Sequence, residues 1–269
     1  LYYELPKLID SVEVTLEIKN SSNEVVNTMS SIKNKSYKKW DGGPPAAAVL
    51  SKKEGLNRFV WNMSYPIMPG VPNVYIEANY RGHKVPPGNY SIQLKVGNKV
   101  VSTNAIINEN PQYKTADGQY KIYDVFMKTM EQSLTEMHQK VNTLYKAQHQ
   151  IKDIVKSLKK KPGNDDLVKV GKELINQLVK WDEDMIQRLS KAYDDVENYS
   201  NKFTAEYMFL INMTESSIQR VNQSSRDRKK ELDTQWKVLN NRANVLINSA
   251  IPKYNKQLWD AGIGAIQLN

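Results

Sequence analysis

The sequence predicts an α+β protein of two domains. Residues 1–112 are expected to form an immunoglobulin- or fibronectin-like β-sandwich, and residues 117–269 an antiparallel α-helical bundle of about four helices. Two observations predict this class. Before about residue 110, apolar and polar residues alternate, and most of the prolines and glycines lie there. After about residue 117, apolar residues recur at steps of three and four. The first pattern is typical of strands and the second of amphipathic helices.

The first domain is predicted to consist of short strands joined by turns. The clearest strand is 12–18, in which Val12, Val14, Leu16 and Ile18 point to one face. Further strands are expected at residues 1–5, 24–29, 57–63, 74–78, 89–96 and 100–107, with a long irregular loop at 30–54. Strands at this spacing favour a sandwich.

The second domain is predicted from its helical periodicity and its breaks. A long helix from about Asp117 ends at Pro162-Gly163-Asn164, and a second, capped by Asn164 or Asp165, continues to Val196. A shorter helix is expected near 204–221, and a last long helix begins after a cap at Ser224-Ser225. Pro252 should bend that last helix or end a turn, because proline lacks the backbone N–H. Long amphipathic helices with short connections imply an antiparallel bundle.

Composition excludes several classes of function. The chain carries a net charge of +9, but its lysines are spread along the sequence among acidic residues, which argues against a nucleic-acid partner. Cysteine is absent, and the three histidines His83, His138 and His149 are too far apart to share a metal ion. We therefore expect neither metal nor cofactor. No apolar run approaches the roughly 20 residues that span a bilayer.

Two groups of residues are candidates for chemistry or binding. Asp182-Glu183-Asp184 and Asp194-Asp195 resemble the paired carboxylates of glycoside hydrolases, but a solvated helix face explains them better. Among the aromatic residues, Trp61 and Tyr90 are expected in the sandwich core. Trp40 and Tyr65 lie in loop contexts and are the candidate contacts for a glycan or a protein partner.

Several motifs together resemble one protein family. They are, in order, Leu1-Tyr2-Tyr3-Glu4-Leu5-Pro6, Val14-Thr15-Leu16-Glu17-Ile18 with Glu24-Val25-Val26, Gly55-Leu56-Asn57-Arg58-Phe59-Val60-Trp61-Asn62, Pro87-Gly88-Asn89-Tyr90 and Asn108-Glu109-Asn110-Pro111. In this order they resemble the C-terminal region that follows the β-propeller in large exported bacterial proteins with BNR-type, sortilin-like repeats, often labelled glycosyl hydrolases. The structural motif residues are Asn57, Arg58, Trp61, Pro87, Gly88 and Tyr90. Asn62 stands where the family usually has an acid, and Asn110-Pro111-Gln112 replaces an Asp-Pro-Arg-like end.

The resemblance implies a non-catalytic accessory region. It would pack on its own upstream β-propeller, which is expected before Leu1, and its helices would offer a surface to an envelope or surface protein. The location implied is the periplasm, the cell surface or the medium. Two alternatives stay open. The parent protein could be an exo-sialidase-like glycoside hydrolase with its active site on the propeller, or this region could be a carbohydrate-binding module that uses Trp40 and Tyr65. No catalytic residue is assigned within the chain.

Overall fold

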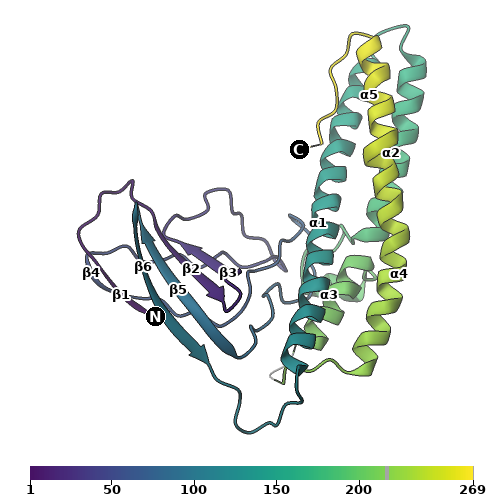
Figure 1. Ribbon diagram of the computed structural model, residues 1–269. Helices are drawn as coiled ribbons and strands as arrows, with labels where there is room; N and C mark the ends of the chain where they lie inside the picture. The colour runs from purple at the N-terminus through teal and green to yellow at the C-terminus, as the bar shows by residue number, and fades with distance from the viewer. Residues whose placement is uncertain (216–217, 269) are drawn as a thin grey trace.

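The computed structural model describes residues 1–215 and 218–268. Over these residues it has an α+β fold in which six strands, arranged in two antiparallel sheets, precede a set of long helices. Figure 1 shows the strands on one side of the molecule and the helices on the other, with α1 on the side that faces the strands. The α+β class predicted from the sequence is therefore confirmed.

The larger sheet has the strand order β3-β2-β5-β6, and the smaller one pairs β1 with β4. The strands are β1 (Tyr2–Leu5), β2 (Val14–Asn20), β3 (Val25–Ser30), β4 (Gly55–Arg58), β5 (Gly88–Val96) and β6 (Lys99–Ile107). Val14, Leu16 and Ile18 of β2 are buried in one apolar cluster with Tyr3 of β1 and Tyr90 of β5. The two sheets therefore share a core.

The C-terminal part of the chain consists mainly of long helices. Its elements are α1 (Gln119–Leu158), α2 (Asp165–Met185), a 3-10 turn (Tyr193–Glu197), α3 (Phe203–Thr214), α4 (Gln223–Val245), a π-helical segment (Leu246–Ala250) and α5 (Ile251–Asp260). At 40 residues, α1 is about 60 Å long. The apolar residues that recur along α1 at steps of three and four, from Tyr123 to Leu158, are buried, except that Phe126 is only partly buried. The second helix is shorter than predicted because the chain turns extended at Ile186.

Pro252 changes the hydrogen bonding of the last long helix. It cannot donate a hydrogen bond to the preceding turn, and the π-helical segment Leu246–Ala250 lies directly before it. Figure 1 shows α4 and α5 running on as one rod through this point. At the start of the rod, Asn222 is the cap, since its Oδ1 accepts the Ser225 N–H at 2.7 Å. The predicted cap at Ser224-Ser225 lies two to three residues too late.

A glycine sets how closely the rods approach. A Cβ at Gly171 of α2 would lie 2.5 Å from the Tyr254 hydroxyl of α5 and 2.5 Å from a Val155 methyl of α1. Only a residue without a side chain fits here, so α2 can contact both neighbours. Within the described part of the chain, no helix is both long and apolar enough to cross a membrane.

One segment of the N-terminal half packs among the helices. We call residues 66–83 the strap. Five apolar side chains of the strap are buried in the same cluster as the helical core, namely Met68, Val71, Val74, Ile76 and Tyr80. The strand predicted at 74–78 does not form. Its Val74 and Ile76 side chains pack in the helical core, and the Tyr75 N–H donates to the Ser190 carbonyl at 3.1 Å, so the stretch joins no strand ladder. Just before it, Pro66, Pro69 and Pro72 lack the N–H that a ladder needs.

Candidate functional site

A group of ionisable side chains lies where the strap meets α1. His83 is fully buried there. Its Nδ1 lies 2.9 Å from Oε1 of Glu131, and its Nε2 lies 3.1 Å from Oδ1 of Asp124. The backbone N–H of His83 also donates to Oε1 of Glu131 at 2.8 Å. Together with Tyr65 and Lys128, these residues form what we call the His83 cluster.

The geometry favours the protonated form of His83. An ionised carboxylate only accepts hydrogen bonds, so each ring nitrogen that faces one must carry a hydrogen. His83 is therefore an imidazolium between two carboxylates. Burial lowers the pKa of His83, but the hydrogen bonds and charges of Asp124 and Glu131 outweigh burial and raise the pKa above its usual value.

The other members complete the charge balance. Lys128 Nζ lies 2.8 Å from Oδ2 of Asp124. Burial raises the pKa of Asp124, but the bonds from His83, Lys128 and Tyr65 outweigh it, so the net shift is downward. The Tyr65 ring stacks on the His83 ring with centroids 4.5 Å apart, and Lys128 Nζ sits 4.7 Å from the Tyr65 centroid. Burial, followed by the bond to Asp124, raises the pKa of Tyr65, which keeps its phenol protonated.

One helix face supplies most of this cluster. Asp124, Lys128 and Glu131 are spaced four and three residues apart on α1, which places them together on one side of the helix. The partners from the N-terminal half, Tyr65 and His83, come from a stretch without regular structure. The cluster therefore joins one face of a long helix to both ends of the strap.

The arrangement suits a structural clamp better than a catalytic site. Because both nitrogens of His83 donate, the ring has no free lone pair with which to act as a general base. Further bonds fasten the same stretch: Gln219 Nε2 donates to the Lys84 and Val85 carbonyls at 3.0 and 3.1 Å. His138 Nδ1 lies 2.7 Å from the Pro69 carbonyl and donates to it. Burial lowers the pKa of His138 to about 4, so that ring is neutral.

An open groove runs beside the cluster. It has a volume of about 560 Å³ and lies between β3, the start of the strap and α1. Val26 and Ile67 line its apolar side, while Lys128, Glu131 and Gln139 line the side formed by α1. Three members of the His83 cluster, Tyr65, Lys128 and Glu131, thus also form part of the groove wall.

The two residues predicted to contact a glycan or partner are both engaged within the chain. The Trp40 indole N–H donates to the Val74 carbonyl at 3.0 Å. Gly43 and Gly70 pack so closely on the Trp40 ring that a Cβ would lie 2.4 Å and 3.1 Å from it. Tyr65 is a member of the His83 cluster, with one neighbour stacked on its ring. Both residues hold the strap.

Two of the six motif residues, Asn57 and Arg58, lie on β4. Asn57 is buried; its Nδ2 donates to the Lys53 and Gly55 carbonyls at 2.8 and 2.9 Å, and its Oδ1 accepts from Ser51 at 2.5 Å. Arg58 is exposed at the end of β4.

The remaining motif residues form a packed corner at the start of β5. Trp61 packs edge-on against Tyr90, with ring centroids 6.0 Å apart. The Tyr90 hydroxyl donates to the Pro86 carbonyl at 2.6 Å and closes the turn that includes Pro87 and Gly88. Tyr90 is buried and Trp61 is partly buried against the same core, in the positions expected for core aromatics.

One expectation about the acidic residues is wrong. Asp182 is buried and does not lie on a solvated face, because Arg188 binds both of its oxygens at 2.5 and 2.7 Å. The chain folds back just after α2 and brings Arg188 over this position, where its guanidinium also lies 3.5 Å from the Tyr145 ring centroid. Glu183 and Asp184 are exposed, as expected for a helix surface.

In the second acidic pair, too, one residue is exposed and the other is bound within the chain. Asp194 is exposed, while Asp195 accepts the backbone N–H groups of Lys191 and Ala192 at 2.6 and 3.0 Å and so caps the 3-10 turn. No paired carboxylates of a hydrolase follow from either group.

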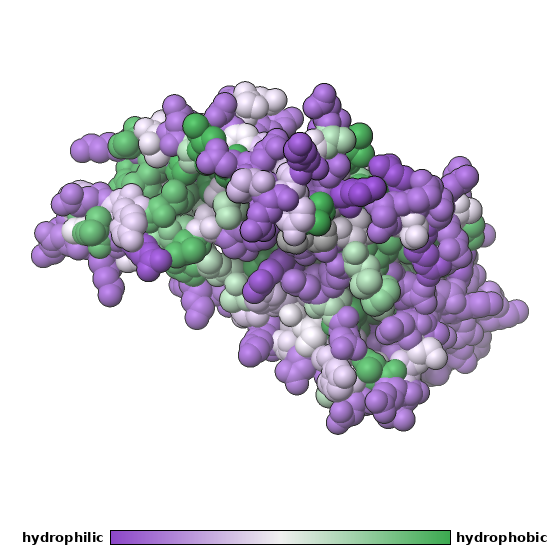
Figure 2. Space-filling model, turned by 90° about the horizontal axis from the view of Figure 1, so that it is seen from below, coloured by the Kyte–Doolittle hydropathy of each residue, from purple (hydrophilic) through white to green (hydrophobic). Residues whose placement is uncertain are grey.

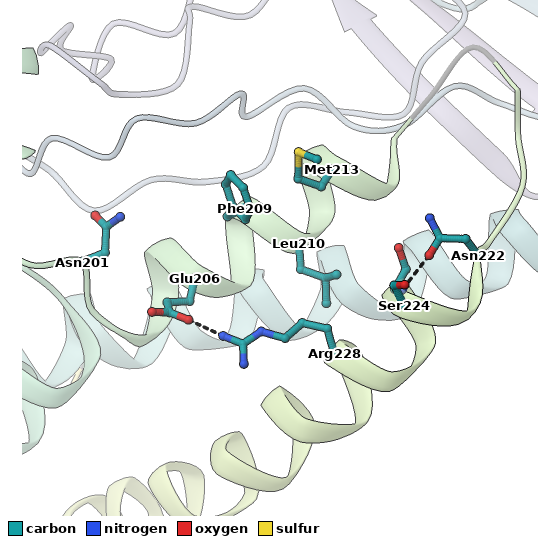
Figure 3. Close-up of a pocket in the computed structure, with 9 residues that line it drawn as sticks. Asn201, Glu206, Phe209, Leu210, Met213, Asn222, Ser224 and Arg228 are labelled. Atoms are coloured by element: carbon teal, nitrogen blue, oxygen red, sulfur yellow. Dashed lines mark hydrogen bonds and ion pairs between the residues drawn. The ribbon is translucent and has the colours of Figure 1, made fainter.

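A second groove lies between α3 and the start of α4. Figure 3 shows Phe209 and Met213 on one side of α3, with Leu210 directed toward α4 and Glu206 paired with Arg228. The volume is about 610 Å³. Phe209 and Met213 are 64% and 65% exposed, which is high for large apolar side chains on neighbouring helical turns. The sequence pattern predicts a helix here but does not indicate which of its apolar residues face outward.

Within residues 1–215 and 218–268, no set of three or more histidine, aspartate or glutamate side chains is arranged to hold a metal ion. Comparison with known proteins gives no match, whether to a protein-family model, to a curated protein or to a solved structure. The family resemblance therefore stays a prediction that rests on the sequence motifs alone.

Proposed function

We propose that this chain is a non-catalytic accessory and interaction region that works by holding surfaces in fixed positions. The observation that carries the proposal is the His83 cluster. Its ionisable groups bind one another and so join the strap to α1. In this proposal, that connection holds the strands in a fixed position relative to the helices. In this proposal the strands form an immunoglobulin-like sandwich behind the β-propeller of an exported bacterial protein with BNR-type repeats.

The outer face of the small sheet supports the proposed contact with an upstream domain. Tyr2 is 69% exposed on β1, Leu56 is 74% exposed on β4, and Val60 just beyond β4 is 67% exposed. Figure 2 shows hydrophobic surface gathered over the strand part, at the left of that view, while the helical part is mostly hydrophilic. Apolar side chains grouped in this way are typical of a surface that another domain covers.

The groove between α3 and α4 is the proposed helical contact for a protein partner. Phe209 and Met213 supply its apolar contact area, and the Glu206–Arg228 ion pair supplies a polar border. This division into an apolar centre and a polar rim is common in protein–protein interfaces. A glycoside hydrolase activity of the parent protein would, in this proposal, reside on the propeller, and this chain would border it.

A binding experiment tests the proposal. The full chain would be titrated with the separately purified upstream region of its parent protein, with Leu56→Lys as the test variant and Leu189→Lys as the matched control, because Leu189 is 61% exposed on the helical part. We expect saturable binding that Leu56→Lys weakens at least about tenfold, since it places a charge in an apolar contact. No binding by the unmodified chain, or equal loss in both variants, would refute it.

A further inference from the structure

The two edges of the larger sheet are treated differently. The edge at β3 is covered: the Asn27 side chain donates to the Ser64 carbonyl at 2.9 Å, Ser30 bridges to Val49, and Val26 lines the groove against α1. The edge at β6 is open. Among the described residues, β6 pairs with β5 and with no other strand. Every second residue of β6 therefore presents an unpaired N–H and C=O on its outer side.

The sequence of β6 carries none of the usual protections of an open edge. Lys-Val-Val-Ser-Thr-Asn-Ala-Ile-Ile has one charge, no proline and nine residues, and it pairs with β5 without a bulge. Val100, Val101 and Ile106 are 54%, 68% and 70% exposed. Natural sheets protect such edges with charges, prolines, bulges or short strands. An edge of this length and composition is therefore open to pairing with another strand.

We propose that β6 pairs antiparallel with β6 of a second copy of this chain and joins the two larger sheets into one. The order would run β3-β2-β5-β6 and then the same strands in reverse. A two-fold axis perpendicular to the sheet keeps the same face of both copies on the same side, so odd-numbered residues lie opposite odd-numbered ones.

The full-length register places the axis at Thr103. Val100 then lies opposite Ile106, Val101 opposite Ala105, and each Thr103 opposite its own copy. The strand thus reads as nearly palindromic, with a polar centre and apolar flanks. Opposed apolar and Thr–Thr pairs are the pairs that stabilise antiparallel sheets. This self-complementarity is why we assign the edge to a second copy and not to an unrelated strand.

Charge does not oppose the pairing, although the chain as a whole carries +9. The two Lys99 residues would stand at opposite ends of the strand pair, about 27 Å apart at 3.4 Å per residue. That exceeds the screening length of about 10 Å at 0.1 M salt. The nearest cation on β5 is Lys95, which is neutralised by Glu17 at 2.6 Å.

The pairing would also extend an apolar surface that the chain leaves half open. On the core side of the sheet, Leu94, Val96, Ala105 and Ile107 are only partly buried, and Val101 is exposed. The small sheet β1-β4 is too short to cover them. A second copy would bring the same residues of its own β5 and β6 alongside and give a continuous apolar surface.

The chain lacks cysteine, so single-cysteine crosslinking can test the register directly. In the full chain, Thr103→Cys would place two thiols face to face, since opposed Cα atoms lie about 4.5 to 5.5 Å apart and disulfides form at these distances. Thr28→Cys is the matched control: it is also an exposed threonine of the same sheet, but on β3. We expect Thr103→Cys to crosslink at least about tenfold faster under mild oxidation, because only its thiols meet in the dimer.

Analytical ultracentrifugation gives an independent measurement. From about 1 to about 200 µM, a range that covers weak to moderate dissociation constants, the mass should rise from 30.9 kDa toward twice that value. Ile106→Lys should hold it at the monomer mass. A chain that stays monomeric throughout, a dimer unaffected by Ile106→Lys, or equal crosslinking of both cysteine variants would overturn the proposal.

Discussion

Removing the imidazolium of the His83 cluster should cost more stability than any single surface change in this chain. His83→Leu takes away two charge-assisted hydrogen bonds, each worth about 1.5 to 3 kcal/mol. It leaves Asp124 and Glu131 facing each other with side chains only 13% and 12% exposed, so water replaces little of what is lost. Breaking a buried ion pair on one side costs about 3 to 5 kcal/mol. We expect a loss in this range at pH 6.

The assay is urea unfolding followed by circular dichroism. His149→Leu is the matched control, because His149 lies exposed on α1 and should change the free energy of unfolding by less than about 0.5 kcal/mol. A His83→Leu loss below about 1 kcal/mol would refute the clamp, since it would mean that the two carboxylates never depended on the ring.

The pH dependence of the free energy of unfolding provides a second test of the His83 cluster. The folded-state pKa of His83 is raised from 6.5, so its contribution is complete below pH 6.5 and is lost as the pH rises through the raised value. The pKa of Asp124 is lowered from 3.8, so its contribution is present above pH 3.8 and is lost as the pH falls through the lowered value. The stability difference between wild type and His83→Leu should therefore be largest between these limits. A difference that grows above pH 6.5 would contradict the assignment.

Three further predictions concern packing. Gly171→Ala should destabilise the chain by about 1 to 3 kcal/mol despite the better helix propensity of alanine, because its Cβ meets the Tyr254 hydroxyl at 2.5 Å; an unchanged thermal midpoint would contradict this. Asp182→Asn should speed proteolysis after α2, whereas the exposed neighbour Asp184→Asn should not, and equal rates would show that burial of Asp182 is irrelevant. Trp40→Ala should lower the free energy of unfolding by roughly 2 kcal/mol and leave the retardation of the chain in glycan-containing affinity gels unchanged. A change in retardation would instead support the hypothesis of a carbohydrate-binding module.

The helices were the most predictable part of the fold. The stripe on α1 is a periodic local signal, and burial follows it from Tyr123 to Leu158. The limits of α2 were less predictable. Apolar Leu189 continues the period beyond Met185, but it is exposed, because the chain leaves the helix when Arg188 folds back to Asp182. That contact is tertiary, and periodicity contains no information about it.

The strap and the His83 cluster could not be predicted, for a related reason. The apolar residues of the strap are irregularly spaced among prolines, so they signal burial without indicating which core buries them. His83 meets its partners 41 and 48 residues later in the chain. One signal was available: Asp124 and Glu131 border the apolar stripe of α1, at positions where acids usually have a buried partner.

The strap also sets an order of events during synthesis. Its five core side chains leave the ribosome long before the helices that bury them. At 5 to 20 residues per second, the roughly 130 residues between Tyr80 and the end of α3, whose Asn212 side chain donates to the Asn79 carbonyl of the strap, take about 7 to 27 s. During that interval the strands can pair, but the segment that joins them to the rest of the molecule stays exposed. Assembly of the molecule is therefore completed from its C-terminal end, and a ribosome stalled after β6 would hold a chain with its central apolar segment uncovered.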